Sequence, residues 1–146
     1  MPTETLRPTE STTSGTVLNP SNAFDGNLST YASVQVASQG FASSLRLRGV
    51  PVYSAAVSTV ELVVRREYES LDTRDSAQLF ARKQNADDWT LVDENSPPED
   101  FPSGSPATQT FDVTAIMGAT PATSWEILSQ FFNGPGAIPD PPDFTG

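Results

Sequence analysis

The chain of 146 residues carries 8 Lys and Arg against 18 Asp and Glu, giving a formal net charge of −10, and it contains 13 prolines, no cysteine and no histidine. Disulfides, thiolate sites, histidine-ligated metals and histidine-based catalysis are therefore excluded. Nucleic-acid binding without sequence preference is not expected, because neutralising phosphates requires clustered Lys and Arg.

The apolar residues gather in the middle of the chain, whereas both ends are polar and rich in proline. This length is typical of one domain. We expect an extended N-terminal arm or edge strand over residues 1–18, an ordered body over residues 19–132 and a proline-rich C-terminal tail over residues 133–146. No basic start with an apolar run marks a signal peptide, and no stretch approaches the ~20 apolar residues of a membrane helix, so we expect a cytoplasmic product without membrane contact.

Along the body, alternation of apolar and polar residues predicts short strands separated by turn formers. The expected strands cover residues 31–37, 43–48, 57–67, 76–84, 89–92, 108–114 and 124–132. Residues 76–92 favour a hairpin, and residues 116–120 favour a turn or a short helical piece. Prolines make residues 93–107 a long acidic loop. A series of short strands without a convincing helix predicts an all-β fold, an antiparallel β-sandwich or barrel.

Six carboxylates gather around the expected acidic loop: Asp87, Asp88, Asp93, Glu94, Glu99 and Asp100. Hard divalent cations take several oxygen ligands, so such a cluster could bind one. The spacing does not match an EF-hand loop. We favour the alternative of a solvated loop that keeps the protein soluble.

Two arginines, Arg46 and Arg48, stand two residues apart on one face of a predicted strand. They could meet an acidic neighbouring subunit, although a solvated outer face of the sheet explains them equally well. Arg65 and Arg66 are expected to form surface ion pairs with the glutamates that follow them. No serine, lysine or tyrosine stands beside a candidate base in a known motif, so we expect no enzymatic activity.

The two ends of the chain offer apolar anchors for a partner. Ile138 and Phe144 lie among the prolines of the tail, and proline-rich segments lose less entropy when they are ordered. Leu6 and Val17 could serve in the same way at the other end. The alternative is that both ends are frayed termini.

Residues 23–30, with the sequence AFDGNLST, resemble the AFDGxxxT motif of discoidin-like, galactose-binding jelly-roll domains. The wider order is similar to jelly-roll proteins found among tailed-phage structural genes, with LRP at residues 6–8 before the motif and SLRLRG at residues 44–49 after it. The resemblance implies that the β-sandwich is of the jelly-roll type.

The resemblance also implies roles for residues of the motif. Phe24 would pack into the core, and Asp25 would shape a turn. Asp25, Asn27 and Thr30 would be candidate ligands of a structural calcium ion. The alternative, which we favour, is an Asx turn that needs no metal.

The implied function is a non-enzymatic structural protein of a tailed-phage virion, and we favour a capsid decoration (cement) protein that stabilises the head shell through subunit contacts. Its expected partners are the major capsid protein and copies of itself, in a homo-oligomer such as a trimer. It would bind neither nucleic acid nor membrane, and it would reach the virion from the host cytoplasm. The residues expected at its interfaces are Leu6, Val17, Arg46, Arg48, Ile138 and Phe144.

The alternative function is a carbohydrate-binding module of a phage fibre or tail apparatus engaged in host attachment. It would bind a glycan through the loops beside residues 25–30. Tyr53, Tyr68 or Trp89 would then have to be exposed as aromatic platforms. Apart from calcium, neither function implies a cofactor.

Overall fold

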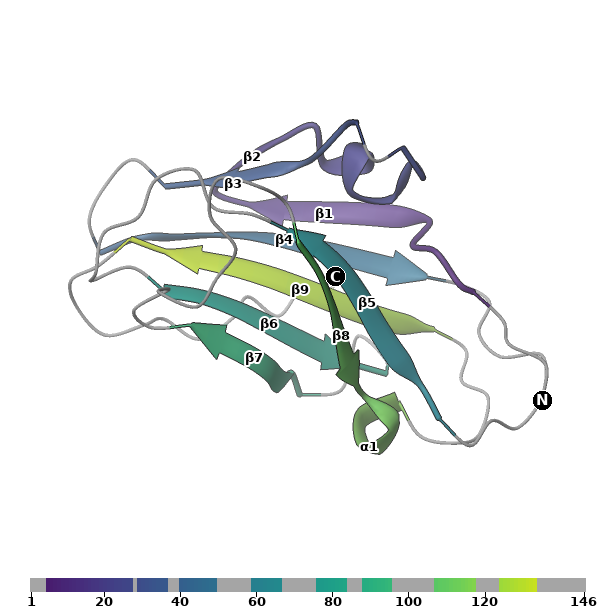
Figure 1. Ribbon diagram of the computed structural model, residues 1–146. Helices are drawn as coiled ribbons and strands as arrows, with labels where there is room; N and C mark the ends of the chain where they lie inside the picture. Colours follow the sequence, from purple (N-terminus) through teal and green to yellow (C-terminus); the bar gives the residue numbers. More distant parts are fainter. Residues whose placement is uncertain are drawn as a thin grey trace.

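The strands found in the computed structural model are arranged in antiparallel sheets (Figure 1). The structure describes residues 5–27, 29–36, 40–49, 59–66, 76–83, 88–95, 107–117 and 124–133. The elements within these ranges are β1 (Glu10–Ser14), β2 (Thr16–Leu18), the 3-10 helix η1 (Pro20–Phe24), β3 (Ser33–Gln35), β4 (Ala42–Gly49), β5 (Glu61–Arg66), β6 (Ser76–Arg82), β7 (Thr90–Asn95), β8 (Ala107–Asp112), α1 (Thr114–Met117) and β9 (Trp125–Phe132).

A five-stranded sheet forms the largest part of the described fold, with the strand order β1-β4-β9-β6-β7. Two further pairs, β2–β3 and β5–β8, stand beside it, and every pairing is antiparallel. The expected all-β, antiparallel architecture is therefore confirmed. None of the helices within the described ranges has the length and hydropathy that crossing a membrane requires.

Several predicted elements are confirmed, because their alternation is strong and local. Strands β4, β6 and β9 occupy the expected ranges, and β6 pairs with β7 as the predicted hairpin, with a bulge between Leu79 and Phe80. The prediction that the acidic loop starts at residue 93 was wrong, since Asp93 and Glu94 belong to β7. The Asp93 carboxylate is held there by an ion pair with Arg66 of β5, which the local sequence does not reveal.

The largest apolar cluster lies on one face of the five-stranded sheet. Residues directly opposite one another on antiparallel strands share a face, so Ala81 and Ile127 point to the same side. The buried members of this cluster are Leu79, Ala81, Val113, Met117 and Ile127. Leu62, Val64 and Phe111 of the β5–β8 pair pack against the cluster, and Figure 1 shows this pair lying across the large sheet.

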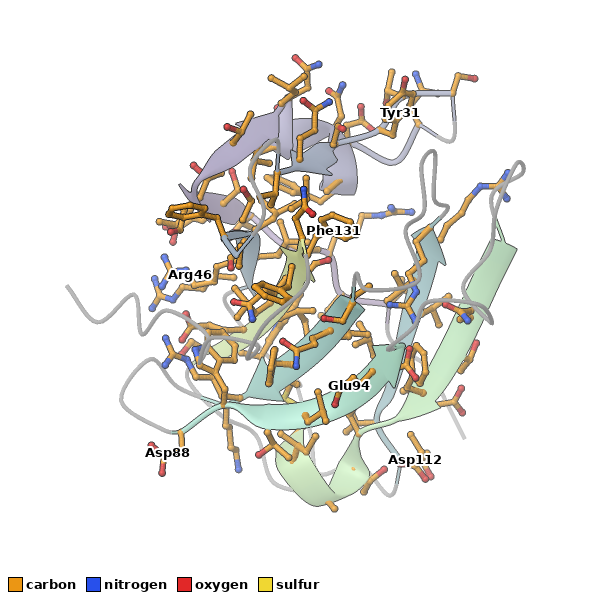
Figure 2. The ribbon with its side chains drawn as sticks, turned by 90° about the vertical axis from the view of Figure 1, so that its left-hand side faces the viewer. Tyr31, Arg46, Asp88, Glu94, Asp112 and Phe131 are labelled. Carbon is orange, nitrogen blue, oxygen red and sulfur yellow. The ribbon has the colours of Figure 1, made fainter. Side chains whose placement is uncertain are left out.

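The β2–β3 pair is fastened to the large sheet by the hydroxyl of Ser43. This Oγ accepts a hydrogen bond from the backbone N–H of Thr16 at 3.0 Å and donates one to the carbonyl of Gln35 at 2.6 Å. Gly15 precedes β2 with a φ of 79°, which side chains rarely adopt. Figure 2 shows Tyr31, which precedes β3, and Asp112, which ends β8, at opposite ends of the molecule.

A close approach of backbone and ring fixes one end of the sheet. Gly49 of β4 is the register partner of Trp125 of β9. A Cβ atom added at Gly49 would lie only 2.1 Å from Cε2 and Cζ2 of the indole ring. The ring also packs against the apolar core, so it cannot move away freely.

The variant Gly49→Ala should therefore be destabilised by about 1–3 kcal/mol, the usual cost of overpacking. Urea unfolding should show a lower midpoint with an unchanged slope. Adding Trp125→Leu to Gly49→Ala should recover part of the loss, because the clash is removed. An unchanged midpoint for the single variant would contradict the packing described.

Candidate functional site

The three residues predicted as calcium ligands come together in one tight turn, which we call the Asp25 turn (Asp25, Gly26, Asn27, Ser29 and Thr30). The Asp25 Oδ1 accepts the backbone N–H of Asn27 at 2.7 Å, and its Oδ2 accepts the Thr30 hydroxyl at 2.5 Å. Asn27 Oδ1 in turn accepts the backbone N–H of Ser29 at 2.9 Å. Gly26, with a φ of 79°, allows the chain to reverse.

The donors within the turn favour the charged form of Asp25. The hydrogen bond from Thr30, followed by that from the Asn27 amide, holds the pKa of the Asp25 carboxyl below its ordinary value. Both oxygens of this carboxylate are engaged by the chain itself. These internal hydrogen bonds are those of the Asx-turn alternative, whereas calcium binding by Asp25, Asn27 and Thr30 stays a prediction.

A divalent-cation site at the acidic loop finds no support in the part of the chain that is described. Asp93 is paired with Arg66, and Asp88 and Glu94 are exposed. Within the described ranges, no group of three or more acidic side chains could hold a metal ion. The other three members of the expected cluster, Asp87, Glu99 and Asp100, lie outside the described residues.

The expectation that Phe24 packs into the core was wrong. Phe24 is only half-buried, and η1 contains no buried residue. The core instead lies between the large sheet and the β5–β8 pair. The motif therefore predicted the turn but not the packing of its aromatic residue, because a turn depends on neighbouring residues and packing depends on distant strands.

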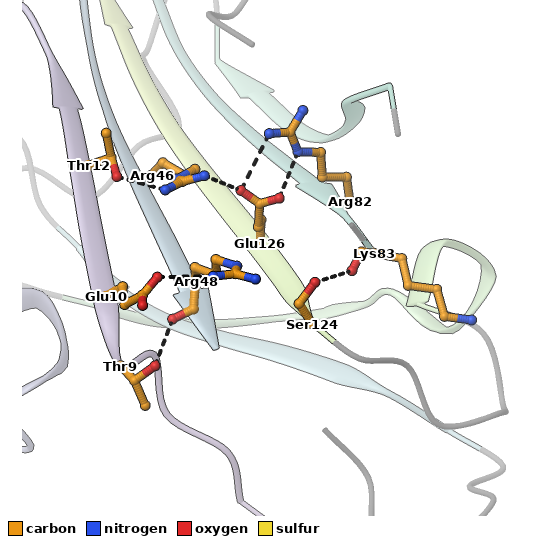
Figure 3. Close-up of polar contacts among 9 residues, drawn as sticks. All are labelled: Thr9, Glu10, Thr12, Arg46, Arg48, Arg82, Lys83, Ser124 and Glu126. Atoms are coloured by element: carbon orange, nitrogen blue, oxygen red, sulfur yellow. Dashed lines mark hydrogen bonds and ion pairs between the residues drawn. The ribbon is translucent and has the colours of Figure 1, made fainter. Parts of the chain in front are cut away.

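The opposite face of the large sheet, which we call the Glu126 face, buries charged and amide side chains beside the apolar Phe80, Leu128 and Phe132. Figure 3 shows Glu126 between two arginines. Arg46 Nη1 lies 2.7 Å from Glu126 Oε1, and Arg82 Nε lies 3.1 Å from Oε2. The side chains of Glu126 and Arg82 are fully buried, and that of Arg46 is 11% exposed. Such a buried ion pair is stable only when its geometry is good and its remaining polar atoms are bonded.

The strand register creates this arrangement. Glu126 of β9 lies opposite Arg48 of β4 on one side and Arg82 of β6 on the other. Arg46 reaches Glu126 diagonally and also donates to the Thr12 hydroxyl of β1 at 2.7 Å. The Glu126 face thus links four neighbouring strands by side-chain bonds as well as by the backbone ladder.

A second row of polar contacts crosses the Glu126 face beside the ion pairs. The Ser44 hydroxyl donates to Gln130 Oε1 at 3.1 Å, and Gln130 Nε2 donates to Gln78 Oε1 at 2.8 Å. All three side chains are buried. These two hydrogen bonds limit the cost of burying the Ser44 hydroxyl, the Gln130 amide and the Gln78 oxygen.

The arginines expected to face a neighbouring subunit are engaged within the chain. Arg46 is bonded to Glu126, and Arg48 lies 3.2 Å from Glu10 in a partly exposed ion pair. Arg66 pairs with Asp93 and bonds Gln109, which ties β5 to β7 and β8.

The remaining predicted positions are only partly described. Leu6 is 38% exposed and Val17 is half-buried. Of the predicted aromatic platforms, Trp89 is described. The Cζ atom of Arg82 lies 3.9 Å from the centroid of the Trp89 ring, so the guanidinium covers one face of that ring. Ile138, Phe144, Tyr53 and Tyr68 lie outside the described residues.

Comparisons of the chain with models of known families, with curated proteins and with solved structures give no match.

The isosteric variant Glu126→Gln should lose at least about 3 kcal/mol of unfolding free energy, because both buried arginines lose their shared counter-charge. Glu10→Gln is the matched control, because Glu10 pairs with Arg48 at the surface with 57% of its side chain exposed. That change should cost about 0–1 kcal/mol. If urea unfolding gives the same loss of unfolding free energy for both variants, the burial of Glu126 does not make its ion pairs more important than the exposed one.

The variant Thr30→Val should raise the pKa of Asp25 toward its ordinary value, since the hydroxyl is the main cause of the lowered pKa. Because the pKa of Asp25 is lower in the folded than in the unfolded protein, its charged form stabilises the fold at pH values above the unfolded pKa. That stabilisation is lost as the pH falls through the folded pKa. Carbon-13 NMR titration of the carboxyl should show the shift. Thr114→Val is the control, and it should move only Asp112, whose pKa Thr114 lowers. A pKa of Asp25 that is unaltered by Thr30→Val would contradict the turn.

Proposed function

We propose that this chain is a non-enzymatic structural protein of a tailed-phage virion, and that it decorates the capsid and stabilises the head shell through subunit contacts. The observation that supports the proposal best is the distribution of charge. Arg46, Arg48, Arg66 and Arg82 are all paired with carboxylates of the same chain. These are four of its 8 basic residues, whereas it has 18 acidic ones.

We infer from the excess of acidic over basic residues that the surface of the protein is mostly negative. A surface of one sign steers a protein toward a partner of the opposite sign and keeps it away from nucleic acid. A basic patch repeated over a capsid shell is a partner of this kind. Many weak contacts of this sort, added over a shell, would hold it against internal pressure.

The fold that we infer is a β-sandwich of the jelly-roll type. The packing of the β5–β8 pair over the apolar face of the large sheet supports two layers. The position of the Asp25 turn, directly after η1 and within the motif at residues 23–30, agrees with the resemblance to jelly-roll domains. Such a rigid β framework suits a protein whose role is to make contacts.

Exposed apolar side chains on strands supply candidate contact points. Val63 of β5 is 61% exposed and Leu91 of β7 is 46% exposed. With Leu6 and Val17, they would pack against the major capsid protein or against copies of the chain in a homo-oligomer. Arg48 is the more exposed of the two predicted interface arginines. Ile138 and Phe144 of the tail would add anchors at the other end of the chain.

The protein should co-sediment with tailed-phage heads purified from a mutant that lacks it. Binding should weaken as salt is raised to about 1 M, where charges are screened within about 3 Å. Removing residues 134–146 should weaken binding further without lowering the urea midpoint.

A matched control separates charge from apolar contact in this experiment. Val63→Ser should reduce binding at both low and high salt, because an apolar contact is not screened by ions. If the full chain sediments with neither heads nor tails at low salt, the proposed function is wrong. Binding to tails alone would contradict capsid decoration and would favour the alternative, a carbohydrate-binding module of the tail apparatus.

A further inference from the structure

The outward face of the β5–β8 pair is exposed to solvent. Because successive residues of a strand point to opposite sides, Leu62 and Val64 face the apolar cluster and the residues that alternate with them face away from it. The exposed residues lie directly opposite one another on the two strands, and we call the six of them the Val63 face: Glu61 and Asp112, Val63 and Thr110, Arg65 and Thr108. Figure 2 shows Asp112, at one end of this face, on the side of the molecule opposite Arg46.

One end of the Val63 face carries two carboxylates. Glu61 and Asp112 are direct cross-strand partners, and like charges in that position destabilise a pair of strands. The Thr114 hydroxyl donates to Asp112 Oδ1 at 2.7 Å and holds the pKa of that carboxyl below its ordinary value, so the carboxylate stays charged at neutral pH. Within the described ranges, neither carboxylate forms an ion pair. A cation at this end would therefore be stabilising.

The opposite end of the Val63 face carries a positive charge. Arg65 follows Glu61 by four residues on the same side of β5, which corresponds to about 13 Å along a strand. The guanidinium of the neighbouring Arg66 is paired with Asp93, whereas Arg65 is exposed and has no ion-pair or hydrogen-bond partner in the part of the chain that is described. The face thus has a negative end and a positive end, and neither is neutralised within the described chain.

An exposed apolar side chain lies midway between these two ends. Val63 is 61% exposed and is two residues from Glu61 and two from Arg65. A two-fold axis through Val63, lying between two facing copies and across their strands, would reverse the order of the charges. The positive end of one copy would then cover the negative end of the other. A surface with this property is self-complementary, as a two-fold contact between identical chains requires.

We propose that the Val63 face is a two-fold contact between two copies of this chain. The Val63 side chains meet at the axis, and Arg65 of each copy pairs with Glu61 of the other, beside Asp112. The inference selects a second copy, and not the major capsid protein, as the partner of Val63. It does not rest on the role of the chain in a virion, because the self-complementary charges belong to the chain alone.

The size of the face sets the strength of the contact. Three residues from each of two strands are far fewer than the roughly 20–30 residues a side of a stable complex, so the association is weak. A weak dimer still matters on a repeating lattice. Two linked copies bind more tightly than one, and loss of the self-contact therefore weakens binding to such a lattice as well.

The test is sedimentation equilibrium of the purified full chain from about 10 μM to about 1 mM, which should show a reversible equilibrium between monomer and dimer. Arg65→Glu and Glu61→Arg should each weaken the dimer at least about tenfold, because each sets like charges against one another at two symmetric contacts. Val63→Asp, which places two carboxylates at the axis, should weaken it too. All three side chains are exposed, so the variants should keep the wild-type circular dichroism spectrum.

A mixture of the two charge variants tests the two-fold arrangement itself. Arg65→Glu and Glu61→Arg chains in equal amounts should dimerise about as strongly as the wild type, because opposite charges then meet at both contacts. Glu61→Arg also separates this contact from general repulsion, since it reduces the net charge of −10 by two and would by that effect alone strengthen association. The matched control is Glu94→Arg, the same change at an exposed position of β7, which should not weaken the dimer.

The proposal is overturned if the wild-type chain is a monomer at about 1 mM, if Glu61→Arg dimerises as strongly as the wild type, or if the mixture gains nothing over either variant alone. A trimer that resists all three substitutions would overturn it as well, because association would then use another surface. A monomer that still sediments with phage heads would refute this contact alone. A dimer that does not sediment with heads would refute only the role in the virion.

Discussion

A carboxylate buried between two guanidinium groups is the constraint on which the large sheet depends. Glu126 has no exposed surface, and its oxygens are reached by Arg46 from β4 and by Arg82 from β6. A one-residue slip of either neighbouring strand would turn its arginine to the apolar face and leave a buried charge uncompensated. The ion pairs therefore specify register, while the apolar cluster on the other face and the buried Phe80, Leu128 and Phe132 on this one supply the hydrophobic contribution.

The same pairing connects the fold to its proposed use. Arginines that neutralise carboxylates inside the fold cannot offset the acidic residues at the surface. The excess of acidic residues, 18 against 8 basic ones, is the feature on which the proposed docking to a basic partner depends.

The sequence predicted those features that depend on neighbouring residues. Alternation marked β4, β6 and β9, and the Asp25 turn followed from residues no more than five positions apart. It could not predict that Glu126 would meet Arg46, since 80 residues separate them and only the β4–β9 register brings them together. Phe24 was misplaced for the same reason.

Native-state hydrogen exchange tests most directly whether the Glu126 face holds the sheet together. The account predicts that the amides of Leu128, Arg46 and Phe80, at the centre of β9, β4 and β6, exchange only through global unfolding. The amide of Val17 in the β2–β3 pair should exchange through a smaller, local opening. Central amides that exchange as fast as that of Val17 would contradict the account, because the strands around Glu126 would then open without unfolding the protein.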